Sequence, residues 1–276
     1  QGKSNAMWNE RKMSFWKEYE VNGLARVIAI ANQKGGVGKT TTAVNLSACL
    51  AENGKKVLLV DVDPQGNATS GLGINKKELQ ISLYDVLVSD TPLEEAVVAT
   101  ELESLFLVPA TIQLAGAEVE LVSAFSRELK LKRALQKSLE KFDYILIDCP
   151  PSLGLLTINS LSAADSLLVP IQCEFYALEG LSQLMQTVSL VQNNLNPQLE
   201  LEGVLLTMFD GRTNLSLQVA EEVRSHFGGK VYETIIPRNV RLSEAPSYGQ
   251  PIIKYDPRSK GAEVYGELAL EVIRRV

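Results

Sequence analysis

A glycine-rich loop between two apolar segments constrains the fold of this chain more than any other feature. The loop follows the β-branched run at 27–31 and precedes a helix-compatible segment at 43–50. Strand, glycine loop and helix in this order form a phosphate-binding loop, where backbone N–H groups and the helix dipole meet an anion. Glycine permits that approach because it has no Cβ to clash. The sequence therefore predicts a site for the phosphates of a nucleoside triphosphate.

Two side chains of this loop predict its chemistry. Lys39 is placed to neutralise the β- and γ-phosphates, and so to assist catalysis, and the Thr40 hydroxyl is placed to ligate Mg²⁺. The residues expected to bind the nucleotide are Gly35, Gly36, Val37, Gly38, Lys39, Thr40 and Thr41.

The loop departs from the usual pattern G-x-x-x-x-G-K-[ST]. Gln33 stands where that pattern has glycine, and an additional lysine, Lys34, precedes the glycines. This arrangement resembles the deviant Walker A motif of the ParA/MinD superfamily. The resemblance implies a catalytic role for Lys34, which would reach across a dimer interface to the partner's nucleotide. From the residues alone, a solvated turn lysine is the alternative.

Two aspartates follow the next predicted strand, at 57–61. Asp61 and Asp63 lie in the run D-V-D-P-Q-G-N, at the edge of an open parallel sheet where ligands bind. Carboxylates at this edge can hold metal-bound water or position an attacking water. The run resembles the switch I segment of ParA proteins, which implies that Asp63 orients the hydrolytic water. A turn or helix-capping aspartate before Pro64 is the alternative.

A third aspartate ends the apolar run at 144–148. This run delivers one carboxylate, Asp148, to the ligand edge in the Walker B manner, and Asp148 is expected to hold Mg²⁺ directly or through water. The following segment, 152–157, resembles the switch II segment of the same superfamily, which reorganises when the γ-phosphate leaves. The widely spaced Cys49, Cys149 and Cys173 suggest neither a disulfide nor a zinc site and are expected to be buried.

The alternation of strands and helices along the chain predicts an α/β fold. Continuous apolar strands with crossover helices imply a doubly wound, mostly parallel sheet with helices on both faces. Residues 25–276 are expected to form a single P-loop ATPase domain, whereas 1–24 are expected to be a tag remnant and a poorly ordered arm. Further predictions include one long helix at 116–142 and a last strand at 231–236.

Two polar loops, 210–214 and 237–246, follow late strands at the ligand edge. Met208 and Pro237 are plausible apolar walls for adenine. The loops also resemble ParA segments that bind DNA without sequence preference, which implies phosphate contacts by Arg212 and Arg241 and weaker ones by Arg238 and Lys254. A surface ion pair is the alternative for any one of these arginines.

Composition limits the possible partners. The net charge of −6 argues against a protein that binds nucleic acid over its whole surface, but a local basic face is compatible with it. The segment between 228 and 260 contains six basic residues and three acidic ones. No apolar stretch approaches the ~20 residues of a membrane span, so the chain is expected to be cytoplasmic and membrane partners are not expected.

The resemblance extends from Arg26 to Val276 and is closest to short chromosome-partitioning ATPases of the ParA/Soj type. It implies a Mg²⁺-dependent ATPase that binds ATP or ADP and forms a homodimer with ATP. The dimer would bind DNA non-specifically on the nucleoid and be released by hydrolysis, which a ParB-type centromere-binding partner stimulates. The alternative is a membrane-localised regulator of the MinD type, which shares the nucleotide site but needs a basic amphipathic tail beyond the fold, whereas the last helix predicted here is expected to belong to the domain.

Overall fold

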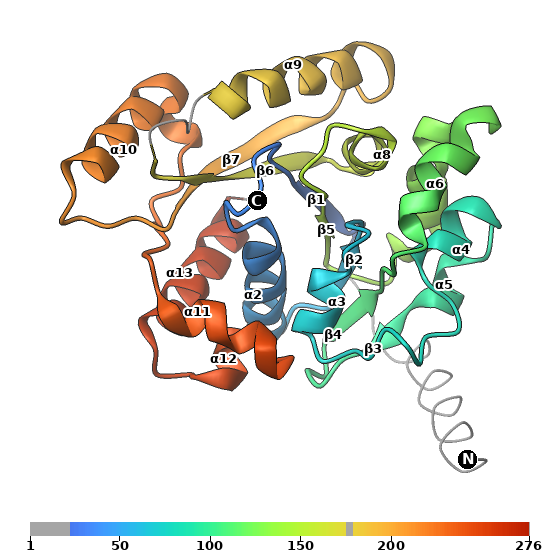
Figure 1. Cartoon of the computed structure of the whole chain (residues 1–276), viewed down its shortest axis with the longest axis horizontal. Coiled ribbons are helices and arrows are strands. Elements are labelled where there is room, and N and C mark those ends of the chain that lie inside the picture. The colour runs from blue at the N-terminus through green and yellow to red at the C-terminus, as the bar shows by residue number, and fades with distance from the viewer. Residues whose placement is uncertain (1–22, 175–178, 276) are drawn as a thin grey trace.

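The computed structural model describes residues 23–174 and 179–275, and these form one twisted sheet with helices on both faces (Figure 1). The prediction for the N-terminal arm falls almost entirely on residues 1–22, outside the described part. The sheet has seven strands in the order β3-β4-β2-β5-β1-β6-β7. Their bounds are β1 Arg26–Ile30, β2 Val57–Asp61, β3 Val98–Ala99, β4 Leu105–Val108, β5 Tyr144–Asp148, β6 Ser166–Gln172 and β7 Glu200–Thr207.

Every neighbouring pair of strands is parallel except the short pair β3–β4. The strands β1, β2 and β5 are apolar along almost their whole length because helices cover both faces of the sheet. The predicted doubly wound, mostly parallel α/β fold is therefore confirmed. The carboxyl ends of the parallel strands meet at one edge, which we call the ligand edge.

The helices divide between the two faces, each with its own apolar core. One core joins the sheet to α2 Lys39–Glu52, α3 Asn67–Gly71, α11 Val240–Glu244, α12 Ile252–Tyr255 and α13 Lys260–Arg274. The other joins it to α4 Leu83–Val88, α5 Leu93–Ala96, α6 Leu114–Glu120, α7 Lys130–Leu135, α8 Leu155–Ala163, α9 Glu179–Asn194 and α10 Asn214–Phe227. Figure 1 shows α2 beside α13 on one side of the sheet, with α9 and α10 on the other. The three cysteines are buried and free, as expected.

The long helix predicted at 116–142 is wrong. The helix α6 ends at Glu120, a short 3-10 turn follows at Leu121–Ser123, and α7 begins only at Lys130. Between them the backbone becomes extended at Ala124 and left-handed at Ser126, where φ is 51°. Both conformations break the i to i−4 ladder, which the helical spacing of leucines could not reveal.

The last strand predicted, at 231–236, is wrong too. Among the described residues, this segment runs beside β7 but makes only one isolated bridge to it, between Val231 and Val204. The N–H groups of Tyr232 and Ile236, four residues apart, reach the carbonyls of Val204 and Leu206, only two residues apart. Since a parallel ladder needs matched spacing on both strands, the segment bulges and cannot continue the sheet.

Candidate nucleotide-binding and catalytic site

The glycine loop occupies the turn between β1 and α2. Gly36 and Gly38 have left-handed backbones, with φ of 73° and 89°, and Gly38 is the N-terminal cap of the 14-residue helix α2. Glycine adopts these angles without strain, whereas a residue with a Cβ does not. The loop therefore presents backbone N–H groups and the positive end of a long helix to the same space.

Side chains that the sequence analysis missed hold this loop in place. Asn32 donates from its amide to the Pro170 carbonyl (2.7 Å) and accepts from the Lys34 N–H (3.0 Å). The Thr207 hydroxyl donates to the carbonyl of Val37 (2.9 Å). Both residues are buried. Their signal in the sequence is a polar residue directly at the end of an apolar strand, which the search for charged groups passed over.

Lys39 lies inside this loop. Its side-chain amine donates to the carbonyl of Lys34 (3.0 Å), and the residue is only 6% exposed. Burial lowers the pKa of Lys39, while the nearby Asp148, Cys149 and Asp63 oppose that shift. The amine is therefore a buried cation whose described hydrogen-bond acceptor is a neutral carbonyl, a poor substitute for a phosphate oxygen.

Asp148 is buried at the end of β5, directly opposite Asp61 of β2 in the strand register. Neither of its carboxylate oxygens has a hydrogen-bond partner of normal geometry among the described residues. Burial, together with the neighbouring Asp61, raises the pKa of Asp148 well above its usual value, and the Thr40 side chain and Lys39 oppose that rise. A buried carboxylate without a partner is costly unless a cation joins it. Asp148 and the Thr40 hydroxyl thus fit a Mg²⁺ ion.

The two aspartates after β2 do different things. Asp61 is fully buried and accepts from the N–H (2.8 Å) and hydroxyl (2.7 Å) of Thr69, so it holds the start of the following segment; burial raises its pKa to about 6. Asp63 accepts from the Gln65 N–H (2.9 Å) through one oxygen. Asp63 therefore makes the turn contact that is expected if it has only a structural role. It also lies at the ligand edge beside Lys39, where a catalytic residue is expected.

Met208 and Pro237 line one pocket together with Gly38 and Thr41. The pocket has a volume of about 290 Å³ and adjoins the start of α2. Met208 has a left-handed backbone (φ 50°), which is unusual for a residue with a side chain and is a form of strain that gathers at functional sites. The two predicted adenine walls thus lie together beside the phosphate loop.

The predicted DNA-binding residues are spread over exposed surface. Three of them pair with carboxylates of the same chain: Arg212 with Asp210 (2.7 Å), Arg238 with Glu174 (3.7 Å) and Arg241 with both Glu244 (2.8 Å) and Asp256 (3.5 Å). Lys254 is exposed on α12. The surface ion pairs expected as the alternative are thus present for these three arginines. Because all three side chains are exposed, they are also accessible to phosphate groups. Lys34 also pairs with Glu174 (3.5 Å).

Three features define a P-loop nucleotide-binding protein of the α/β class: a glycine loop at a helix N-terminus, a buried lysine within it, and a buried aspartate at the ligand edge that lacks a hydrogen-bond partner of normal geometry among the described residues. The chain matches the model of the AAA domain over residues 25–201. It is 66% identical to the sporulation initiation inhibitor protein Soj of Bacillus subtilis, over 90% of this chain and 98% of that protein. The chain belongs to the ParA/Soj family of chromosome-partitioning ATPases.

Solved structures share this fold. A structure from Mycobacterium smegmatis, described as cobyrinic acid a,c-diamide synthase with bound ADP and magnesium, is 44% identical with a TM-score of 0.80, over 91% of this chain and 95% of that chain. The septum site-determining protein MinD of Pyrococcus horikoshii, complexed with Mg-ADP, is 30% identical with a TM-score of 0.76, over 90% and 96%. Within the described residues, no helix is long and apolar enough to cross a membrane.

Proposed function

We propose that this protein is a nucleotide-controlled switch that binds Mg²⁺-ATP, dimerises, holds DNA and lets go of it after hydrolysis. The observation that carries the proposal is Asp148, a buried carboxylate beside Thr40 and Lys39 that has no hydrogen-bond partner of normal geometry among the described residues. Such a group is costly in the nucleotide-free protein and is stabilised when a cation enters. The relatives and neighbouring structures named above support the same ligand.

The phosphate site uses the loop from Gly35 to Thr41. Its backbone N–H groups and the N-terminus of α2 would surround the phosphates, and Lys39 would exchange the Lys34 carbonyl for a phosphate oxygen. Thr40 and Asp148 would hold Mg²⁺, which when bound neutralises charge on the β- and γ-phosphates. Met208 and Pro237 would enclose the adenine in the pocket next to Gly38.

Asp63 is the proposed positioning group for the attacking water. One of its oxygens accepts from the Gln65 N–H, which fixes the carboxylate in the turn after β2. The second oxygen is then available to orient a water molecule toward the γ-phosphate. A carboxylate is a weak base, so we expect slow turnover without a stimulating partner.

The ATP-bound state would be a face-to-face dimer in which Lys34 contacts the nucleotide of the partner subunit. The dimer would bind DNA through backbone phosphates, with Arg212 and Arg241 as main contacts and Arg238 and Lys254 as weaker ones. A ParB-type protein at centromere-like sites would stimulate hydrolysis and so release the dimer. The protein would then be cytoplasmic and associated with the nucleoid. Support comes from the family, whose named members partition chromosomes.

Light scattering tests the switch directly. The wild-type protein is sized without nucleotide, with ADP and with a non-hydrolysable ATP analogue, and the Lys34→Ala variant is sized in parallel. We expect a dimer only for the wild-type protein with the ATP analogue. A monomer under all conditions would refute ATP-dependent dimerisation, and a normal dimer of the variant would refute the role of Lys34.

Co-sedimentation separates DNA binding from membrane binding. DNA and anionic vesicles are each incubated with the protein and the ATP analogue, at low and high salt. We expect sedimentation with DNA that declines steeply as salt rises. Sedimentation with vesicles and not with DNA would reverse the proposal in favour of a MinD-like membrane role.

A further inference from the structure

Glu174 joins two cations that the proposed function assigns to different tasks. Its carboxylate pairs through one oxygen with Lys34 (3.5 Å) and through the other with Arg238 (3.7 Å). Lys34 comes from the loop after β1 and Arg238 from the loop that follows the segment beside β7, so their meeting at Glu174 is a product of the fold. The nearby Gln172 amide also donates to Glu174 and orients it.

The position of this group allows it to compete with ligands. Glu174 is the second residue after β6, at the ligand edge. Arg238 also lines the pocket that adjoins Gly38 and Thr41. The side chains of Lys34, Glu174 and Arg238 are 35%, 45% and 62% exposed, so solvent screens these pairs and anions can reach both cations. The carboxylate therefore stands where a phosphate group would otherwise be attracted.

We propose that Glu174 is a positioning residue that holds Lys34 and Arg238 on their own subunit, and so restrains dimerisation and DNA contact until phosphate groups compete for these two cations. This inference rests on the proposed function, because it concerns the state from which the switch starts. A triphosphate carries several negative charges against one on Glu174, so a partner's nucleotide can draw Lys34 away. DNA phosphates can likewise draw Arg238 away once the dimer supplies further contacts.

The proposal predicts that less ATP analogue is needed for dimerisation when the charge of Glu174 is removed. In Glu174→Gln the side chain keeps its size but no longer holds either cation. Exposed ion pairs are weak, so we expect the concentration of ATP analogue at half-maximal dimerisation to fall about three- to five-fold. DNA affinity without nucleotide should rise by a similar factor at about 50 mM salt, and this gain should disappear at about 500 mM.

Two further variants give the experiment its controls. Glu222→Gln changes the net charge equally at an exposed position of α10 and should leave both quantities within error. The double variant Glu174→Gln/Arg238→Gln should lose the gain in DNA affinity and keep the lower threshold for dimerisation. If Glu174 acted only in folding, its loss would change neither the salt dependence of DNA affinity nor the separation between DNA affinity and dimerisation in the double variant. Thermal unfolding of each variant measures folding separately.

Failure of the inference is distinguishable from failure of the proposed function. If the wild-type protein dimerises with the ATP analogue and Glu174→Gln behaves like Glu222→Gln, the inference is wrong and the switch stands. If the wild-type protein never dimerises or binds DNA, the proposed function itself is wrong and the inference falls with it.

Discussion

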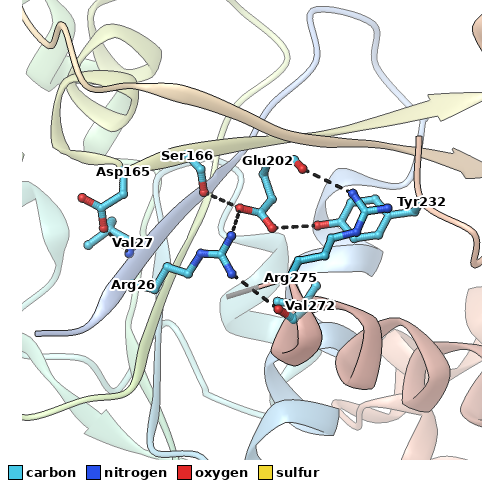
Figure 2. A network of polar contacts seen from close by, with 8 residues as sticks. All are labelled: Arg26, Val27, Asp165, Ser166, Glu202, Tyr232, Val272 and Arg275. Atoms are coloured by element: carbon cyan, nitrogen blue, oxygen red, sulfur yellow. Dashed lines mark hydrogen bonds and ion pairs between the residues drawn. The ribbon is translucent and has the colours of Figure 1, made fainter. Parts of the chain in front are cut away.

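The edge of the sheet where the strands begin and the ligand edge, where they end, differ in how a buried carboxylate is hydrogen-bonded. At the edge where the strands begin, Glu202 accepts from Arg26, from the Ser166 hydroxyl (2.7 Å) and from the Tyr232 hydroxyl (3.2 Å) (Figure 2). Arg275 lies over the Tyr232 ring, 4.0 Å from its centre. At the ligand edge, by contrast, Asp148 has no partner of normal geometry among the described residues.

This difference separates charges that hold the fold from charges that await a ligand. A buried carboxylate whose partners are all present stabilises one arrangement of the chain, while a buried carboxylate without them lowers stability. A protein can retain such a destabilising carboxylate at a site where a bound ligand offsets the cost. The substitutions below test whether the two edges differ in this way.

The largest effect is expected from Asp63→Ala at the ligand edge. If Asp63 orients the attacking water, its loss should reduce the hydrolysis rate by about 10²- to 10⁴-fold and leave ATP affinity nearly unchanged. Phosphate release measures the first quantity and titration with a fluorescent ATP analogue the second. Glu101→Ala, an exposed turn residue, is the control for removal of one carboxylate. Normal hydrolysis by Asp63→Ala would remove Asp63 from the catalytic site.

Glu202→Gln should have the next largest effect, on folding. The amide cannot neutralise Arg26, so a partly buried charge loses its partner and the unfolding free energy should fall by about 3 kcal/mol. Glu200→Gln removes a charge from an exposed position of the same strand and should change it by less than about 0.5 kcal/mol. Urea denaturation compares the two. Equal effects would mean that the network at this edge contributes no particular stability.

The sequence predicted the ligand edge far better than its surroundings. The P-loop and the strands that end in Asp61 and Asp148 are local patterns, since a run of apolar residues and the group that follows it are adjacent in the chain. Glu174 could not be predicted as a partner of Lys34, because the two residues are 140 positions apart and only the sheet order brings them together.

The failures of prediction have a similar cause. Helical spacing of leucines continues across 116–142, but the backbone at Ser126 has a positive φ that spacing does not encode. The segment 231–236 has apolar residues at both ends and is predicted as a strand. In the structure Tyr232 and Ile236 bury their side chains, while the backbone between them bulges away from β7. In both segments tertiary packing overrode a periodic pattern.

Asp148→Asn should stabilise the nucleotide-free protein. Since the pKa of Asp148 is raised in the fold, its ionised form at pH 7 is less favourable there than in the unfolded chain. The neutral amide removes this cost and should raise the unfolding free energy without Mg²⁺. Stabilisation by Mg²⁺ with ADP should be lost in the same variant. Thermal unfolding with and without both ligands measures each effect, and lower stability of the unliganded variant would contradict the contrast between the edges.

The smallest effect is expected from a pair of arginines, one at each edge. Arg212 is 89% exposed in its side chain and pairs only with Asp210 among the contacts described, so Arg212→Gln should leave the unfolding free energy unchanged within error. DNA affinity with the ATP analogue should fall about three-fold, and the slope of its logarithm against that of salt should lessen by about one. Arg275→Gln should lower the unfolding free energy and leave DNA affinity unchanged. The reason is that Arg275 donates to Glu271 (2.7 Å) and to the Val231 carbonyl (3.1 Å) inside the fold. Fluorescence anisotropy over a salt series, beside denaturation, separates the two, and loss of DNA affinity in Arg275→Gln at full stability would show that the opposite edge takes part in binding.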